Sequence, residues 1–238
     1  MTGKRIEEKL KENGIPFHRE LPEKLAVYFR LLQEWNSKMD LTAVLEEEEM
    51  LDKHFLDSLT VLRTSLIPED ASLIDVGTGA GFPGMALALA RPDWRVTLLD
   101  AQQKRLNFLR AVAEATDAKN VVLLHARAEE GGRKRETREA YDVALARAVA
   151  PLNVLCEYLM PFVKLNGRAL CWKGPALRHE LDAGRKAAHL LGGELELPIP
   201  APVAGRDWDH LILPIRKTSA TPAAYPRKAG IPKQKPLN

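Results

Sequence analysis

Hydrophobic residues follow two different spacings along the chain, and the change occurs near residue 70. Before that point, apolar residues recur at steps of three and four, which is typical of amphipathic helices; residues 21–40 carry one such stripe. The stripe resumes over residues 46–62. Its leading glutamates, residues 46–49, are expected to begin a helix because carboxylates favour the positive end of a helix dipole. We therefore expect a helical N-terminal extension over residues 1–70.

From residue 71 onward, short apolar runs alternate with helical patterns. The runs lie at residues 72–76, 95–100, 121–126, 141–146 and 168–173. Strands separated by helices indicate βαβ units, so we expect an α/β domain over residues 71–217, with a mostly parallel sheet and helices on both faces. Two later runs, residues 194–200 and 209–217, are expected to close the sheet as an antiparallel pair.

The end of the chain, residues 218–238, differs from the rest in composition. It contains four prolines and few apolar residues, which predicts an extended tail. From residue 216 to the end there are six basic residues and no acidic one, whereas residues 1–215 hold 29 basic and 32 acidic side chains. A basic, proline-rich end favours a polyanionic partner, with RNA as the first candidate. A solvated tail without a partner explains the charge equally well.

The cysteines and the N-terminus bear on the cellular compartment. Only Cys156 and Cys171 are present, and neither belongs to a Cys-X-X-Cys or Cys/His cluster. This argues against a disulfide framework or structural zinc and fits a reducing compartment. No apolar run approaches the roughly 18 residues of a membrane span, and the charged N-terminus lacks the apolar core of a secretory signal. We expect a cytoplasmic, monomeric protein without metal or membrane contact.

A glycine-rich loop follows the first predicted strand, in the sequence LIDVGTGAGFPG of residues 73–84. A parallel-sheet domain binds its ligand beyond the carboxyl ends of its strands, and Gly77, Gly79 and Gly81 would allow close backbone approach there. The dinucleotide pattern GxGxxG fails because its third glycine is replaced by Phe82. A Walker loop fails because no Gly-Lys-Ser/Thr follows. Phosphate-binding interpretations are therefore disfavoured.

Acidic residues around the loop indicate the ligand. Asp75, two residues before Gly77, would repel a pyrophosphate but suits a ligand with an ammonium group. Asp100 ends the second strand, where it can accept hydrogen bonds from ribose hydroxyls. After the third strand, Ala128 and Glu129 could border an adenine, although a glutamate there also suits a helix start. An amino acid joined to a nucleoside fits all of these positions, which predicts S-adenosylmethionine. A tight turn beside unrelated acids is the alternative.

Several motifs resemble the ribosomal RNA small-subunit methyltransferase G family, also called the glucose-inhibited division protein B family. They are DVGTGAGFPG, DAQQKRLNFL, HARAEE, YDVALARAVAPL, WKG and YPRKAGIPKQKPL, with EWNSKMDLTAV and KHFLDSLTVL in the N-terminal part. The resemblance spans residues 21–237. It implies a Rossmann-like class I methyltransferase that uses S-adenosylmethionine and forms S-adenosylhomocysteine. It further implies that the acceptor is N7 of guanine 527, in the 530 loop of 16S ribosomal RNA, and that Gly77, Phe82, Ala128, Glu129 and Arg147 bind the donor.

The end of the fourth strand and the two cysteines are consistent with guanine N7 as the acceptor. The fourth strand ends LARAVAPL and lacks the Asn-Pro-Pro-Tyr motif that methylation of an exocyclic amine usually requires. Methylation of a pyrimidine carbon needs a cysteine nucleophile, whereas both cysteines here are expected to be core thiols. Guanine N7 has a free lone pair and no proton, so orientation and exclusion of water can supply most of the acceleration.

Arg147, at the end of the fourth strand, is the candidate catalytic residue. As a permanent cation it could hold the donor carboxylate, or it could bind guanine O6 or a phosphate. A surface salt bridge to Asp142 or Glu129 is the alternative. Two residues of the N-terminal part, His54 and Asp57, share a helix face. They are expected to stabilise the helical cap, and the resemblance places them beside the cleft.

Basic residues supply the candidate RNA contacts, each of which could instead be solvated. They are Lys173 after the fifth strand, the charged loop of residues 131–139, and four tail residues, Arg227, Lys228, Lys233 and Lys235. The expected partner is 16S ribosomal RNA or the small ribosomal subunit. Removal of the tail is expected to weaken RNA binding more than donor binding. Two rivals remain, a methyltransferase acting on a protein or small molecule, and a non-catalytic ribosome-assembly factor.

Overall fold

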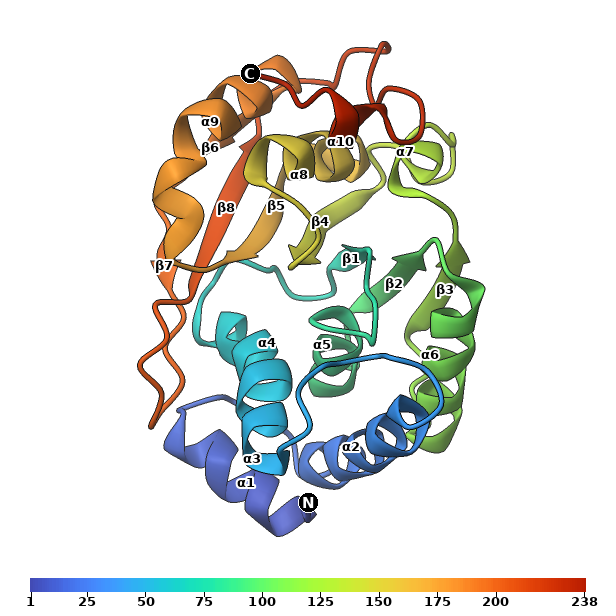
Figure 1. The fold of residues 1–238 in the computed structure, drawn as a ribbon, viewed down its shortest axis with the longest axis vertical. Helices are drawn as coiled ribbons and strands as arrows, with labels where there is room; N and C mark the ends of the chain where they lie inside the picture. The colour runs from blue at the N-terminus through green and yellow to red at the C-terminus, as the bar shows by residue number, and fades with distance from the viewer.

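The computed structural model describes residues 1–238 and has an eight-stranded mixed sheet at its centre (Figure 1). The strand order is β3-β2-β1-β4-β5-β8-β6, with β7 also paired to β8. β1 to β5 are parallel, and β8 is antiparallel to β5, β6 and β7. The strands are β1 Ser72–Val76, β2 Arg95–Asp100, β3 Val121–His125, β4 Tyr141–Arg147, β5 Val163–Lys173, β6 Gly193–Leu195, β7 Ile199–Pro200 and β8 Leu211–Lys217.

The strands confirm the α/β fold predicted from the sequence. β1 and β2 have the expected bounds, and the antiparallel closing pair is present as β6 and β7 against β8. β5 begins five residues earlier than predicted. Val163 pairs with Tyr141, and the register then shifts before Val143 pairs with Arg168. This bulge places polar residues inside the strand, which hides its beginning from the hydrophobic pattern.

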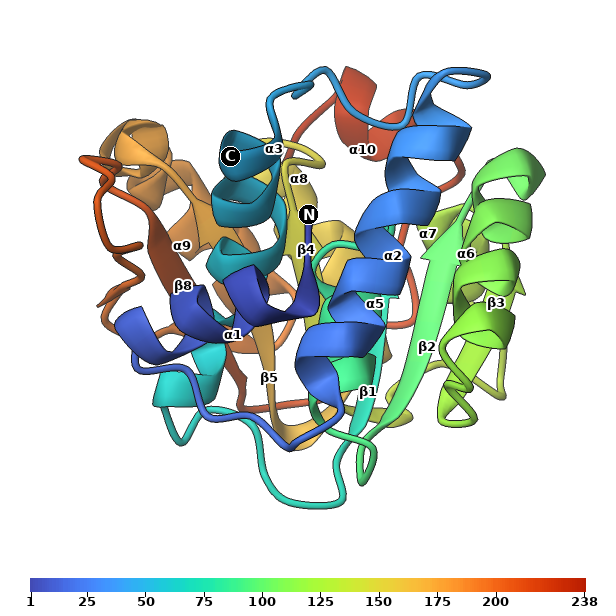
Figure 2. The same cartoon turned by 90° about the horizontal axis from the view of Figure 1, so that it is seen from below.

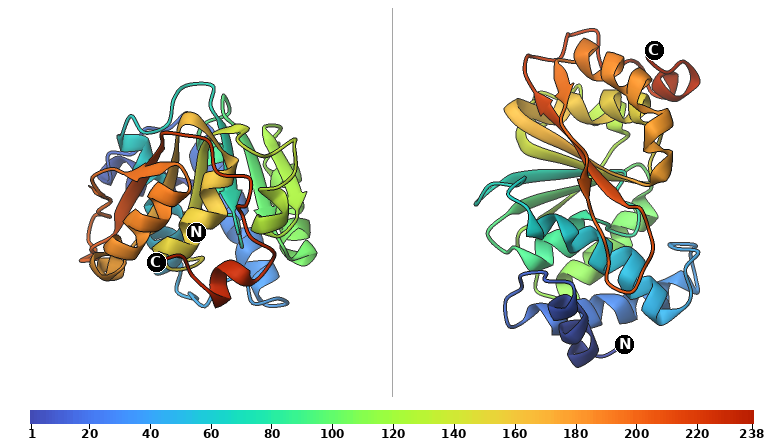
Figure 3. Two further views of the ribbon diagram at one scale, coloured as in Figure 1. Left: turned by 90° about the horizontal axis from the view of Figure 1, so that it is seen from above. Right: turned by 90° about the vertical axis from the view of Figure 1, so that its left-hand side faces the viewer.

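Helices cover both faces of the sheet, as Figures 1 and 3 show. α5 and α6 pack on β1, β2 and β3 on one face, and α8 packs on β4 and β5 on the other. A buried core of 38 residues lies on the α5 side and one of 21 residues on the α8 side. The helices from β1 onward are α5 Gly84–Ala90, α6 Gln103–Ala115, α7 Ala128–Gly131, α8 Leu152–Leu159, α9 Leu181–Leu190 and α10 Ile231–Gln234, with 3₁₀ turns η3 Met160–Phe162 and η4 Pro175–His179.

The N-terminal helices form a further layer outside α5 and α6 (Figure 2). They are α1 Gly3–Glu12, α2 Leu21–Asn36, α3 Glu47–Met50, the π-helix η1 Leu51–Leu56, α4 Asp57–Leu59 and the 3₁₀ turn η2 Thr60–Arg63. As predicted, the glutamate run begins a helix, and the carboxylate of Glu46 caps it by accepting from the amides of Glu48 and Glu49. This extension shares the larger core with the sheet, because its buried side chains belong to the same cluster as those of α5 and α6.

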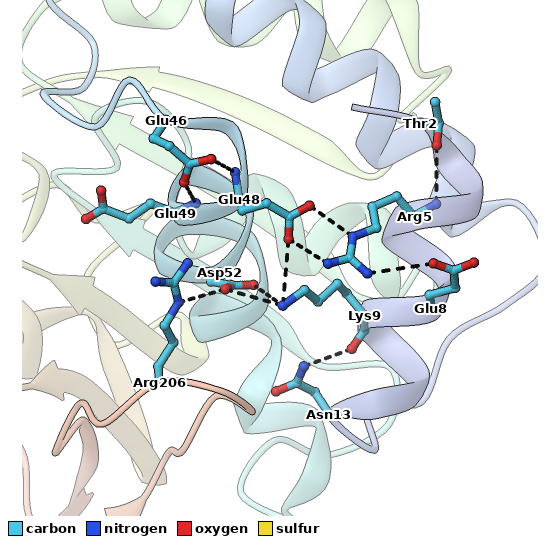
Figure 4. A network of polar contacts seen from close by, with 10 residues as sticks. All are labelled: Thr2, Arg5, Glu8, Lys9, Asn13, Glu46, Glu48, Glu49, Asp52 and Arg206. Atoms are coloured by element: carbon cyan, nitrogen blue, oxygen red, sulfur yellow. Dashed lines mark hydrogen bonds and ion pairs between the residues drawn. The ribbon is translucent and has the colours of Figure 1, made fainter.

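An ion-pair network that includes the buried Asp52 also holds the extension in place (Figure 4). Asp52, in η1, is almost fully buried and contacts Lys9 of α1 at 3.3 Å and Arg206 of the β7–β8 loop at 2.8 Å. Arg5 makes two hydrogen bonds to Glu48, at 2.8 and 2.9 Å. The network therefore joins α1 and η1 of the N-terminal extension to the β7–β8 loop of the sheet domain.

The C-terminal segment differs from the extended tail that its composition predicts. Residues 218–238 return across α7 and α8, and α10 packs on α8 (Figure 1). Arg227 contacts the fully buried carboxylate of Glu157 at 2.6 Å, which gives this proline-rich segment a fixed position on the body. No helix of the protein combines the length and the apolar character needed to cross a membrane.

Candidate functional site

The glycine loop between β1 and α5 is held in shape from behind. Asp75 is buried, and its Oδ2 accepts hydrogen bonds from Thr78 Oγ1 at 2.6 Å and from the Gly84 amide at 2.9 Å. On the other side of the loop, the Tyr28 hydroxyl of α2 donates to the carbonyl of Ala80. The loop shape is therefore set jointly by the end of β1 and by the N-terminal extension.

Burial makes Asp75 an unusual carboxyl group. Desolvation raises its pKa to about 6, although the hydrogen bonds from Thr78 and Gly84 act in the opposite direction. Its second oxygen, Oδ1, is buried and has no hydrogen-bond partner. Buried polar atoms are nearly always satisfied, so this oxygen is an acceptor available to an ammonium group or a water.

A cavity of about 470 Å³ opens beside this loop, at the carboxyl ends of β1, β2 and β3. We call it the donor cavity. Gly77 lies at its base, where a Cβ atom would come within 3.2 Å of Val149. Its walls combine small apolar residues with the carboxylates of Asp100 and Glu129. The lining residues also include Leu99, Ala101, Ala126, Ala128, Tyr158 and three residues of the C-terminal segment, Gly230, Lys233 and Gln234.

The two carboxylates of the donor cavity are positioned by backbone amides. Asp100 accepts from the amide of Gly79 at 3.0 Å and from that of Gln102 at 2.8 Å. Glu129 accepts from the amide of Gly230 at 2.8 Å. Each carboxylate oxygen has two lone pairs, so both groups keep the capacity to accept further hydrogen bonds from a ligand.

A second cavity, of about 350 Å³, adjoins the donor cavity at Ala148, which lines both. We call it the acceptor-side cavity. It lies between the end of β4, the π-helix η1 and the end of β5. Its lining contains three cationic side chains, Lys53, Arg147 and Lys173, against two carboxylates and two imidazoles, which are Asp57, Glu180, His54 and His210. The cavity therefore offers positive charge at the point where the strands β4 and β5 end.

Arg147 lines the acceptor-side cavity rather than the donor cavity. Its Nη1 donates to the carbonyl of Lys53 at 2.8 Å and to the buried carboxylate of Asp57 at 2.9 Å. Its guanidinium carbon lies 5.3 Å from the ring centre of Phe82. Neither of the salt-bridge partners considered from the sequence is used. The guanidinium is instead fixed by the N-terminal extension.

Phe82 lies behind Arg147 and lines neither cavity. Its ring is stacked between those of Tyr28 and His54, each with a centroid distance of 5.2 Å. Burial and the positive charges of Arg147 and Lys53 lower the pKa of His54 to about 4. The neutral imidazole agrees with its contacts, because Arg147 Nη2 lies 3.4 Å from Nδ1 and Thr42 Oγ1 lies 2.7 Å from Nε2.

The other wall of the acceptor-side cavity is built on β5 and β8. Lys173 forms an ion pair with Glu180 at 2.6 Å and donates to the carbonyl of Ala150 at 3.3 Å. His210 Nδ1 lies 2.9 Å from Asp57 Oδ1, and Trp172 Nε1 donates to the carbonyl of Asp57 at 3.1 Å. Asp57 thus joins the extension to β4, β5 and the residue that precedes β8.

Neither thiol belongs to the site. Cys156 and Cys171 are fully buried in the core on the α8 side. Burial raises the pKa of the Cys171 thiol to about 12 and that of Cys156 well above its ordinary value. A thiol nucleophile needs a lowered pKa and access, so both cysteines are core residues, as predicted.

Comparison with known proteins identifies the family to which the chain belongs. Residues 21–201 match the family described as rRNA small subunit methyltransferase G. Curated relatives named "Ribosomal RNA small subunit methyltransferase G" include one from Clostridium botulinum (strain Eklund 17B / Type B), 44% identical over 94% of both chains. Another, from Alkaliphilus metalliredigens, is 46% identical over 90% of both. The chain belongs to this family.

Solved structures of lower identity agree on the fold. A Haloferax volcanii protein solved in complex with a methyltransferase activator superposes with a TM-score of 0.58, at 14% identity over 79% of this chain and 97% of that chain. TYW2 of M. jannaschii in complex with AdoMet superposes with a TM-score of 0.50, at 15% identity over 63% of this chain and 70% of that chain. The predicted class I, S-adenosylmethionine-dependent methyltransferase fold is confirmed.

The donor cavity fits the cofactor of the methyltransferase G family. Its volume lies in the range of sites that enclose drug-sized ligands, and its walls combine small apolar residues with polar and charged ones. Asp100 would accept from the ribose hydroxyls, Ala128 and Glu129 would border the adenine, and Gly77 leaves room for the backbone to approach the ligand. Asp75 does not line the cavity and acts on it through the glycine loop that it holds in shape.

Of the residues singled out from the sequence, the structure brings together two groups. Gly77, Asp100, Ala128 and Glu129 line the donor cavity, while Arg147 and Lys173 line the acceptor-side cavity. The remaining predicted donor residues, Asp75, Gly79, Gly81 and Phe82, support these walls from behind. Of the predicted RNA contacts in the tail, Lys228, Lys233 and Lys235 are exposed, Lys233 also lines the donor cavity, and Arg227 is held by Glu157.

Sequence reasoning missed two contributors to this methyltransferase site, Gln234 and His210, and assigned a third, Lys233, to RNA alone. Lys233 and Gln234 line the donor cavity although they lie more than 100 residues after the other lining residues of β2 and β3. His210 reaches Asp57 across 153 residues of sequence. No local pattern marks these residues, because each becomes part of the site only through the folding of distant segments. The pairing of His54 with Asp57 in one helix was the only available signal for this part of the site.

Proposed function

We propose that the protein transfers the methyl group of S-adenosylmethionine to N7 of guanine 527, in the 530 loop of 16S ribosomal RNA. The observation that carries the proposal is the meeting of the donor cavity and the cationic acceptor-side cavity at Ala148. Membership in a family whose relatives are named for the small-subunit ribosomal RNA supports the RNA acceptor. A target base extruded from its stack would enter the acceptor-side cavity, as enzymes that modify bases require.

Guanine N7 suits this site because it reacts without losing a proton. S-adenosylmethionine supplies an electrophilic methyl group when bound. A bond forms between N7 and the methyl carbon as the bond between sulfur and that carbon breaks, and the positive charge passes from sulfur to the base. No group has to accept a proton, so alignment of the two partners and exclusion of water can supply most of the rate.

The titratable groups of the acceptor-side cavity support an acceptor that needs no base. His54 is neutral but has both ring nitrogens engaged, and Asp57 is held between Arg147 and His210. The buried thiols with raised pKa values disfavour a pyrimidine carbon, whose methylation requires a thiolate. An exocyclic amine has to lose a proton, for which this cavity offers no free carboxylate.

Arg147 is the residue best placed to hold the base. A guanidinium has five N–H donors, and contacts with Lys53, Asp57 and His54 leave the Nε hydrogen and one Nη2 hydrogen without a partner. Guanine presents its O6 and N7 acceptors on one edge. A hydrogen bond from Arg147 to O6 or to the adjoining phosphate would fix the base while N7 stays directed toward the methyl group. Lys173, with one ammonium hydrogen free, would assist.

Transfer of labelled methyl groups tests this proposal. Wild-type protein is given naked 16S ribosomal RNA and, separately, small subunits that lack the modification, and the label is mapped by borohydride reduction and aniline cleavage, which detect 7-methylguanine. We expect label at guanine 527 on at least one substrate. Label at another base, or none on either substrate while donor binding is intact, would contradict the proposal; the latter result would point to a protein or small-molecule acceptor.

The Arg147→Lys variant tests the role of the guanidinium within the same assay. Lysine retains the charge but loses the planar fork, so kcat/KM for RNA should fall by about tenfold to a hundredfold, the range for loss of one or two charge-assisted hydrogen bonds. Donor affinity should change far less, because Arg147 does not line the donor cavity. The exposed Arg185 of α9, exchanged for lysine, provides a control with the same change of side chain. A loss confined to donor affinity would assign Arg147 to the donor instead.

A further inference from the structure

The C-terminal segment contributes a wall to the donor cavity. Gly230, Lys233 and Gln234 line it together with residues at the ends of β1, β2 and β3. In a sheet-based donor site the expected walls are the loops that follow the strands, and this segment comes from the far end of the chain. Because it lines this cavity, the segment has a function other than that of a free basic arm.

The segment is fastened to the body on both sides of the cavity wall. Before it, Arg227 donates to both oxygens of Glu157: Nε lies 3.0 Å from Oε1 and 3.1 Å from Oε2, and Nη2 lies 2.6 Å from Oε2. After it, Asn153 Nδ2 of α8 donates to the carbonyl of Leu237 at 2.8 Å. Glu157 is fully buried, so the ion pair with Arg227 is shielded from water and fixes the segment firmly.

A third contact joins the segment to a donor-site residue. The Gly230 amide donates to Glu129 Oε1 at 2.8 Å, and Glu129 itself lines the donor cavity. The position of this carboxylate, and with it the wall formed by α7, therefore depends on the docked segment. The loop between α7 and β4 adds to the docking, since Arg138 donates to the carbonyls of Thr221 and Tyr225 at 2.7 and 2.8 Å.

The lysines of the segment differ in what they face. Both lysines are exposed and neither forms an ion pair, but Lys233 lines the donor cavity whereas Lys235 does not. Two further cations line the cavity: Arg105, which lies 3.4 Å from Asp100, and Arg127, which forms no ion pair. The cavity otherwise presents the carboxylates of Asp100 and Glu129, and the donor carries a carboxylate of its own. Because Lys233 has no carboxylate partner in the protein, its ammonium group is available to the carboxylate of the donor.

We propose that residues 230–234 are part of the S-adenosylmethionine site, docked through Arg227 and Glu157, and that Lys233 binds the carboxylate of the donor. The proposal depends on the donor but not on the identity of the acceptor. The tail is then a donor-binding element first, and its outward lysines, Lys228 and Lys235, remain the ones available to RNA. This changes the expectation from composition that removal of the tail affects mainly RNA binding.

The proposal is tested by measuring the affinity of the full-length protein for S-adenosylhomocysteine, by calorimetry without RNA. We expect Lys233→Ala to weaken binding about threefold to tenfold, the range for one partly exposed charge-assisted contact. The matched control Lys235→Ala removes the same charge from the same segment and should leave the affinity unchanged. Equal affinities for wild type, Lys233→Ala and Lys235→Ala would overturn the role of Lys233. Equal losses in the two variants would overturn it as well, because they would show a general effect of charge.

Arg227→Ala tests the docking itself and should weaken binding more than Lys233→Ala, because it releases the whole wall. The change leaves a buried carboxylate unpaired, so its thermal unfolding is measured in parallel. If this variant does not fold, hydrogen exchange of the wild-type protein provides the second measurement. Added S-adenosylhomocysteine should slow exchange in residues 227–237. Unchanged exchange there, with protection seen in residues 77–84, would overturn the proposal. Failure of the guanine-N7 assay would leave both results unaffected.

Discussion

The glycine loop allows a comparison of two glycines that differ in what surrounds them. Gly79 and Gly81 both have positive φ, +60° and +97°. A Cβ at Gly79 would meet only the Gly77 carbonyl, at 3.9 Å. A Cβ at Gly81 would overlap the Tyr28 hydroxyl and would come within 2.6 Å of Leu109 Cδ2. Alanine at residue 79 should therefore cause backbone strain alone, whereas alanine at residue 81 should add a steric conflict between the loop and helices α2 and α6.

The magnitudes follow from these two effects. A left-handed conformation costs an alanine about 1–2 kcal/mol, and the loss of glycine flexibility in the unfolded chain returns about 0.4–1 kcal/mol. Gly79→Ala should thus lower the free energy of unfolding by about 1 kcal/mol. Overpacking adds about 1–3 kcal/mol, so Gly81→Ala should lower it by about 2–4 kcal/mol. The difference of about 2 kcal/mol corresponds to roughly 4–8 °C in Tm for a chain of this size.

Thermal unfolding followed by circular dichroism measures both variants under one condition. Tyr28→Phe provides an internal control, because it removes the hydroxyl that the new methyl group would overlap. The double variant Tyr28→Phe with Gly81→Ala should lose less stability than the sum of the two single variants. Melting temperatures of Gly79→Ala and Gly81→Ala within about 2 °C of each other would refute the steric conflict, and additive losses in the double variant would refute the contact with Tyr28.

Three further predictions concern the titratable groups. Because burial raises the folded pKa of Asp75 to about 6 from an ordinary value near 4, its anion is disfavoured in the folded state, and this contribution to stability is lost as pH rises from about 4 to about 6. Relative to wild type, Asp75→Asn should therefore gain more stability at pH 7.5 than at pH 4, by at most about 3 kcal/mol, while it weakens donor binding. Urea unfolding at the two pH values measures this difference in the free energy of unfolding. A difference between variant and wild type that is the same at both pH values would show that burial does not raise this pKa. For His54 the pH dependence has the opposite sign, because its pKa is about 4 in the folded state and about 6.5 in the unfolded chain. Its contribution to stability is lost as pH falls from about 6.5 to about 4, and His54→Gln should remove this dependence. Cys156 and Cys171 should resist a maleimide at pH 7.5 in the native protein and react in urea, and rapid labelling of the folded protein would show that the raised thiol pKa values and burial are wrong.

The sequence predicted the parts of the fold in which local pattern and tertiary position coincide. The runs that became β1 and β2 are apolar because these strands are covered on both faces, so their bounds could be read directly. The glycine loop and Asp100 were recognisable because a strand, a tight turn and a strand-end acid lie close together in sequence. For this reason the donor half of the site could be predicted from the sequence.

The acceptor half depended on distant contacts that no local pattern contains. Arg147 was singled out from its place at the end of β4, but its partner Asp57 lies 90 residues earlier, in a part that only the family resemblance placed beside the cleft. The tail was expected to be extended because its composition is basic and rich in proline. Its docking depends on Glu157, a carboxylate in a helix whose complete burial is visible only in the folded structure.

The most direct measurement of the proposed methyl transfer to guanine N7 replaces a single atom of the acceptor. Small subunits or 16S ribosomal RNA are assembled with either guanine or 7-deazaguanine at nucleotide 527, where the second base carries a carbon in place of N7. Labelled methyl groups are then transferred by the wild-type protein. We expect label on the guanine substrate and none above background on the 7-deazaguanine substrate. Equal labelling of the two would contradict transfer to N7, because the methyl group would then have gone to another atom.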